Sequence, residues 1–120
     1  EERNALGVKI IQAMIAAAKA DGHIDAEEQK RIFSKFDEAG LGMEEKAFLM
    51  DELRKPLDID AIVSLADNTE QAVELYAASC LAIDPDDPAE QAYLAMLSAR
   101  LKLAPELKTN IEAEVEKLTA

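Results

Sequence analysis

The sequence predicts an all-α domain of about seven helices, in which two similar three-helix halves are joined by a short connector helix. Apolar residues recur with the helical period, and no segment alternates with period two as a half-exposed strand would. Residues 20–29 also resemble residues 82–91, an offset of 62 that aligns apolar with apolar positions through about 45 residues. These observations favour an internal duplication, in which residues 5–55 superpose on residues 67–117.

The composition is that of one folded domain, residues 1–120. Apolar residues make up 49% of the chain and aromatic residues only 4%, with no Trp, so the core must be largely aliphatic. The chain opens with Glu1-Glu2 rather than Met. We therefore expect it to be the C-terminal part of a longer protein.

The charge excludes several classes of partner. Thirteen basic and 25 acidic residues give a net charge of −12, which opposes binding to nucleic acid or to anionic lipid.

No apolar run approaches the roughly 18 residues of a membrane span. A single cysteine, Cys80, excludes an internal disulfide, fits a reducing, cytoplasmic compartment and is expected to be a small buried hydrophobe.

The first half is predicted to hold three helices. The first covers about residues 4–20, has an apolar face wide enough for a central position, and ends at Asp21-Gly22. Asp25 caps the second helix, where Glu28 can complete a capping box. The third covers about residues 43–54. The residues expected to face the core from the second and third helices are Ile32, Phe33, Phe36, Ala47, Phe48 and Met50.

The helices of the connector and the second half are bounded by similar cap and proline signals. Asp58 caps the connector helix, and the fifth helix covers about residues 69–83. Asp87 caps the sixth, with Pro88 at its first position, and Pro105 opens the seventh. The residues expected to face inward from the connector and the seventh helix are Ile59, Ile62, Val63, Leu65, Leu107, Ile111, Val115 and Leu118.

Two acidic turns between helices are the candidate site. Hard divalent cations such as Mg²⁺, Ca²⁺ and Mn²⁺ prefer carboxylate and carbonyl oxygens. The candidate ligands are Asp21, Asp25, Glu28, Asp84, Asp86 and Glu90. The first turn has the back half of an EF-hand loop, but Ala17 and Lys19 stand where that loop needs acids. A cation site therefore requires both turns to contribute.

Helix capping is the alternative explanation of the same acids. Asp25 with Glu28, and Asp87 with Glu90, have the spacing of capping boxes. Acids at helix starts are also favoured by the helix dipole. On this interpretation the chain is a metal-independent domain that binds another protein. Capping leaves four acids of the turns unexplained: Asp21, Glu27, Asp84 and Asp86.

No pattern predicts an enzyme. His23 is the only histidine and has no cysteine near it, which argues against a zinc site. Cys80 has no histidine partner in its neighbourhood, and Gly40-Leu41-Gly42 lacks the lysine and the length of a phosphate-binding loop. We expect a binding module with an unidentified protein partner.

Two motifs resemble a known family. The run from Ala18 to Glu28 resembles the signature of the TerB superfamily, named for tellurite-resistance proteins. Leu57-Asp58-Ile59-Asp60, followed by the run from Ala82 to Glu90, is similar to the YebE-like branch of bacterial proteins. The likeness covers nearly the whole chain, and a related module stands at the front of a membrane-anchored DnaJ-type co-chaperone.

The resemblance implies a duplicated helical fold and metal binding through Asp21, Glu28, Asp84 and Glu90. It also implies a role in envelope or metal stress and tethering to the inner membrane by a segment outside this chain. The second motif departs from internal symmetry, because Ile83 stands opposite Asp21 at the offset of 62. The two half-sites would therefore differ in geometry.

Overall fold

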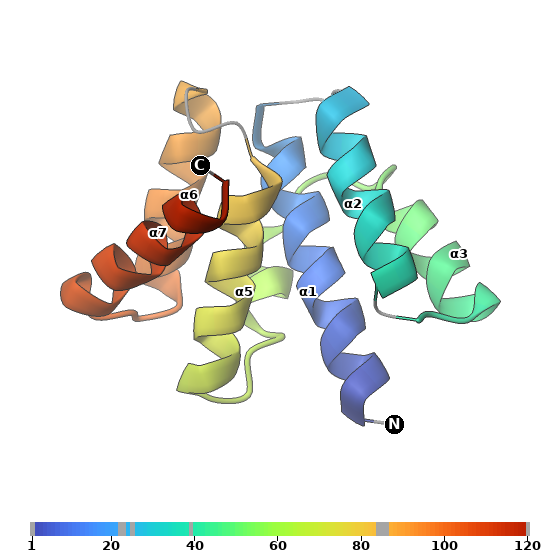
Figure 1. Ribbon diagram of the computed structural model, residues 1–120, viewed down its shortest axis with the longest axis horizontal. Coiled ribbons are helices and arrows are strands. Elements are labelled where there is room, and N and C mark those ends of the chain that lie inside the picture. The colour runs from blue at the N-terminus through green and yellow to red at the C-terminus, as the bar shows by residue number, and fades with distance from the viewer. Residues whose placement is uncertain (1, 22–23, 25, 39, 84–86, 120) are drawn as a thin grey trace.

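Two central helices, α1 (Glu2–Ala18) and α5 (Thr69–Ala82), run side by side in the same direction in the computed structural model (Figure 1). The structure describes residues 2–21, 24, 26–38, 40–83 and 87–119. These residues form seven α-helices and one 3-10 helix and contain no strand, which confirms the all-α prediction.

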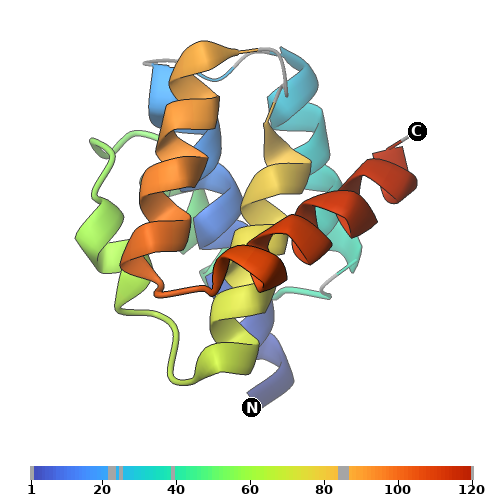
Figure 2. The same cartoon turned by 90° about the vertical axis from the view of Figure 1, so that its left-hand side faces the viewer.

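The remaining helices flank the central pair. On one side lie α2 (Ala26–Glu38) and α3 (Met43–Glu52), and on the other lie α6 (Pro88–Arg100) and α7 (Pro105–Thr119) (Figures 1 and 2). The 3-10 helix η1 (Lys19–Asp21) continues α1, which therefore ends two residues earlier than predicted. The connector is α4 (Ile59–Val63), where the Asp58 side chain accepts the Ala61 N–H as the sequence predicts.

Helix bounds follow the predicted duplication. The bounds of α2 and α6 are related by the offset of 62 at both ends, and α3 and α7 begin at positions related in the same way. The turns that follow α2 and α6 also share their backbone bonds: the Leu41 N–H donates to Phe36 O, and the Leu103 N–H donates to Ser98 O. Both bonds close the last helical turn on carbonyls that have no partner within their helix.

Small residues let α1 and α5 approach each other closely. The Ser79 hydroxyl on α5 lies 3.4 Å from Ala13 O on α1, and both residues are fully buried. Three more buried alanines of α1 are Ala16, Ala17 and Ala18, and three of α5 are Ala72, Ala78 and Ala82. The contact between α1 and α5 lies at the centre of the molecule, as the wide apolar face of the first predicted helix indicates.

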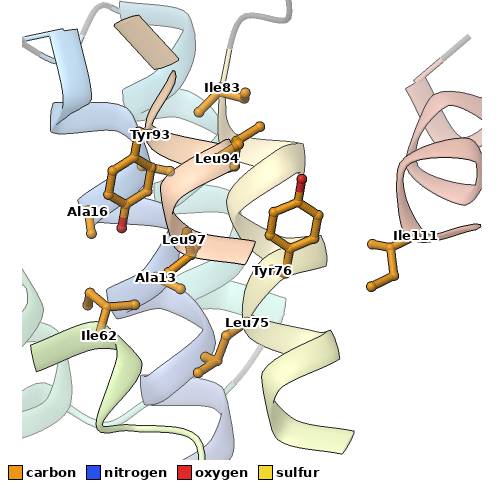
Figure 3. Close-up of a cluster of buried hydrophobic side chains, with 11 residues drawn as sticks. Ala13, Ala16, Ile62, Leu75, Tyr76, Ile83, Tyr93, Leu94, Leu97 and Ile111 are labelled. Atoms are coloured by element: carbon orange, nitrogen blue, oxygen red, sulfur yellow. The ribbon is translucent and has the colours of Figure 1, made fainter. Parts of the chain in front are cut away.

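Larger side chains fill two clusters, one on each side of the central pair. The cluster in the second half brings Tyr76 and Leu75 from α5 together with Leu94 and Leu97 from α6 (Figure 3). The cluster in the first half places Ile32 and Phe36 of α2 against α1. Leu49 in the first half and its counterpart in the second half, Ile111, are both buried.

Five predicted core residues face outward instead, and Ala47 on α3 is one of them. Phe33 is exposed on one side and its ring packs edge to face with that of Phe36, with 5.4 Å between centroids. Phe48 and Met50 are exposed because α3 directs Leu49 toward α1, which turns the neighbouring positions outward. Leu118 is 75% exposed, since it lies at the last turn of α7, which extends past α5 (Figure 2).

Candidate functional site

The two acidic turns join helices at one end of the molecule. Helices α1 and α5 both end there, and α2 and α6 both begin there (Figures 1 and 2). Asp25, Asp84 and Asp86 lie outside the described residues, as do Gly22 and His23. Asp21 closes η1, and only Glu28 and Glu90 among the six candidate ligands have described side chains.

Residues at the helix ends beside each turn contact the other half of the molecule. Helix α6 contacts η1, which belongs to the first half. In return, Arg31 on α2 donates from one guanidinium nitrogen to Ala82 O at 3.5 Å and to Ile83 O at 3.2 Å, at the end of α5. A cation at a helix C-terminus satisfies orphan carbonyls and complements the dipole. The flanks of the two turns are therefore held together.

Glu28 and Glu90 are equivalent residues of the two halves. Each is the third residue of its helix, and they are only 2% and 1% exposed. Acids in the first turn of a helix usually lie at the surface, where water solvates the charge. Burial of a carboxylate is costly unless hydrogen bonds or a positive charge compensate it. Capping by itself does not require such burial.

Helix capping is confirmed where the described residues allow a test. The Asp87 side chain accepts the backbone N–H groups of Ala89 at 2.8 Å and of Glu90 at 3.1 Å, and Pro88 opens the helix as predicted. Asp87 therefore serves as an N-cap. The predicted cap of α2, Asp25, is outside the described residues.

Within the described part of the chain, no three residues among His, Cys, Asp and Glu are grouped as a metal site. Glu28 and Glu90 nevertheless have the donor chemistry that hard cations select, because each carboxylate offers two oxygens. The start of each helix also favours a negative charge at this position. The residues present thus fit a hard divalent cation in donor type.

A second polar cluster was not foreseen from the sequence. The Tyr76 hydroxyl on α5 donates to Glu112 on α7 at 2.8 Å, and Lys108 pairs with the same carboxylate oxygen at 3.0 Å. Cys80, one turn after Tyr76, is half-buried, and burial raises its thiol pKa to about 11. The thiol is therefore protonated at neutral pH.

Arg31 was also missed. Its signal in the sequence is weak, because a basic residue near the start of an exposed helix is ordinarily solvated. Its role depends on the neighbouring half, which places the end of α5 within reach of its guanidinium.

Comparison with known proteins identifies the family. A family model described as "Protein of unknown function (DUF533)" matches residues 1–115. The chain belongs to the DUF533 family. An "Uncharacterized protein in ampR 5'region" from Yersinia enterocolitica is 33% identical over 107 residues, which cover 89% of this chain and 77% of the relative. No solved structure matches the chain. No helix in the described part is both long and apolar enough to cross a bilayer.

Proposed function

We propose that this DUF533 domain is a non-enzymatic module that binds a divalent cation, Mg²⁺, Ca²⁺ or Mn²⁺, through its two acidic turns, at the end of the molecule where α2 and α6 begin. The ligands are drawn from Asp21, Asp25, Glu28, Asp84, Asp86 and Glu90. We also propose that the DUF533 domain belongs to the TerB superfamily and to its YebE-like branch. It also includes a role in bacterial envelope or metal stress, beside the inner membrane and without nucleic acid as a partner.

One observation carries the proposal: Glu28 and Glu90 are buried at equivalent positions of two helices that begin at the same end. Nearby acids repel one another in a region of low dielectric, and a cation between them converts that repulsion into attraction. The crossed contacts of η1 with α6, and of Arg31 with the end of α5, support convergence of the two turns.

The second candidate function is a metal-independent domain that binds another protein. The N-cap formed by Asp87 favours it, because it accounts for one acid of the second turn without any ligand. The two functions make different predictions for the acids that are buried rather than capping.

A melting experiment separates them. The protein is heated with and without millimolar Mg²⁺, Ca²⁺ or Mn²⁺, against a monovalent salt of equal ionic strength. At about 100 times the dissociation constant, a bound ion adds roughly 2.7 kcal/mol to the free energy of unfolding, which raises Tm by several degrees. Glu28→Gln, Glu90→Gln and the Asp21→Ala, Glu28→Ala double variant should each lose most of this increase.

Glu27→Gln is the matched control, because Glu27 is exposed beside Glu28 and loses the same charge. It should keep the wild-type response to metal. A Tm that divalent cations leave unchanged, or variants that lose equal stability with and without metal, would leave capping as the whole role of these acids.

A further inference from the structure

A cavity of about 710 Å³ lies between the upper parts of α5, α6 and α7 and is open to solvent. Its lining residues are Arg31, Cys80, Leu81, Ile83, Gln91, Leu94, Glu112, Val115 and Glu116. In Figure 2, α6 stands upright beside α5, whereas α7 crosses α5 obliquely and its C-terminal end points away from α6. The volume is within the range of about 300–1,000 Å³ that ligand sites occupy.

The cavity is lined by apolar residues from the second half, by two acids of α7 and by one basic residue, Arg31 of α2, whose guanidinium donates to Ala82 O and Ile83 O. Leu81 comes from α5, Ile83 is the residue after its end, Leu94 comes from α6 and Val115 from α7. Glu112 and Glu116 are one helical turn apart on α7, so both carboxylates lie on the same side of the cavity as Val115. Tyr76 and Lys108 hold Glu112 in place from outside that lining.

The acidic wall is not a requirement of the fold. At the offset of 62, Met50 stands opposite Glu112 and Arg54 opposite Glu116. In the first half, therefore, neither α3, which carries Met50, nor the turn after it, which carries Arg54, has an acid at these two positions. The pair of glutamates distinguishes the second half, where the cavity lies.

We propose that this cavity is a docking site for a basic amphipathic helix of a partner protein. Apolar side chains from one face of such a helix fill the space among Leu81, Leu94 and Val115, as in other helix-in-groove complexes. Its flanking Lys or Arg residues face Glu112 and Glu116. The net charge of −12 attracts a basic partner over long range and speeds association. This inference does not depend on the proposed cation site.

The first test uses two peptides of about 18 residues, one made of Leu and Lys and one of Leu and Glu, with the same helical pattern. Binding is followed by NMR shifts and by alkylation of Cys80, the single cysteine, which lines the cavity. The Leu/Lys peptide should bind, shift the cavity residues and slow alkylation. Equal binding of the Leu/Glu peptide, or unchanged alkylation in the presence of bound Leu/Lys peptide, would overturn the proposal.

A pair of charge reversals tests the location. Glu116 and Glu114 are both exposed residues of α7, but only Glu116 lines the cavity, and Glu114 pairs with Lys117. Glu116→Lys should weaken binding of the Leu/Lys peptide about tenfold, because attraction is replaced by repulsion at short range, whereas Glu114→Lys should change it less than about twofold. Equal losses in the two variants would mean that the peptide responds only to net charge.

A third variant fills the space without altering charge. Val115→Trp places a large ring in the cavity from α7, where Val115 is only half-buried. It should abolish protection of Cys80 by the peptide while the helical content and the melting transition persist. Retention of full affinity in this folded variant would place the peptide elsewhere on the protein.

Discussion

Gly40 and Lys102 occupy equivalent positions of the two halves and share a left-handed backbone, with φ of 64° and 61°. Each lies two residues after the last residue of α2 or α6 and begins the turn to the next helix. The N–H of Gly40 donates to Asp37 O and that of Lys102 to Ala99 O, so the two turns also match in their bonds. Glycine adopts this conformation without steric cost, whereas lysine does not.

Exchange of the residue type at these two turns should therefore change stability in opposite directions. Lys102→Gly should raise the free energy of unfolding by about 0.5 kcal/mol, because relief of strain exceeds the extra freedom of the unfolded chain. Gly40→Ala should lower it by about 1 kcal/mol, although a Cβ would meet no atom within 4 Å. Chemical denaturation measures both. Lys102→Ala is the control: it removes the side chain but keeps the strain, so a gain equal to that of Lys102→Gly would contradict this explanation.

Two buried tyrosines should respond oppositely to loss of the hydroxyl. Among the described residues, the Tyr93 hydroxyl has no hydrogen-bond partner, whereas the Tyr76 hydroxyl donates to Glu112. Tyr93→Phe should therefore stabilise the protein by about 1 kcal/mol, and Tyr76→Phe should destabilise it by a similar amount. Thermal melts of the two variants provide the comparison. A loss of stability in Tyr93→Phe would show that its hydroxyl is hydrogen-bonded in the folded protein.

The cap of α6 should carry a measurable share of stability. Asp87→Ala leaves the N–H groups of Ala89 and Glu90 without their acceptor and should cost about 1 kcal/mol. Asp87→Asn keeps an acceptor oxygen and should retain most of that energy. Glu70→Ala, which removes a charge from the first turn of α5 but no cap, should stay within about 0.5 kcal/mol of wild type. Equal effects of Asp87→Ala and Glu70→Ala on urea unfolding would indicate that charge, not capping, is responsible.

The thiol of Cys80 should react slowly at neutral pH and faster as the pH rises. Burial raises its pKa to about 11 from an ordinary value of 9.0, which favours the neutral thiol in the folded state. Because the thiolate is the nucleophile, alkylation should accelerate about tenfold per pH unit from neutral pH to about pH 10 and then approach a plateau. In denaturant the plateau should begin near pH 9. A folded protein with the lower midpoint would have a solvated thiol, contrary to the structure.

The helices could be predicted because their signals are local. Asp87 and Pro88 define the start of α6 through bonds and torsions confined to one turn, and Asp58 does the same for α4. The duplication is also written in the sequence, since the same local signals recur at the offset of 62. The helix bounds confirm the predicted helices, and those of α2 and α6 agree with the offset of 62. The superposition of residues 5–55 on residues 67–117 stays a prediction. The proposed cation site and its ligands stay predictions.

Only the tertiary structure shows which side chains are buried and which contacts join the two halves. Glu28 and Glu90 read as ordinary helix-start acids, yet both are buried. Phe33 continues an apolar pattern, yet it faces outward. Arg31 acts on α5, some 50 residues away in sequence, and the cavity is lined by residues from both halves of the chain. Helix periodicity specifies a face but not the neighbour that covers it, because burial depends on contacts between segments that are distant in the chain.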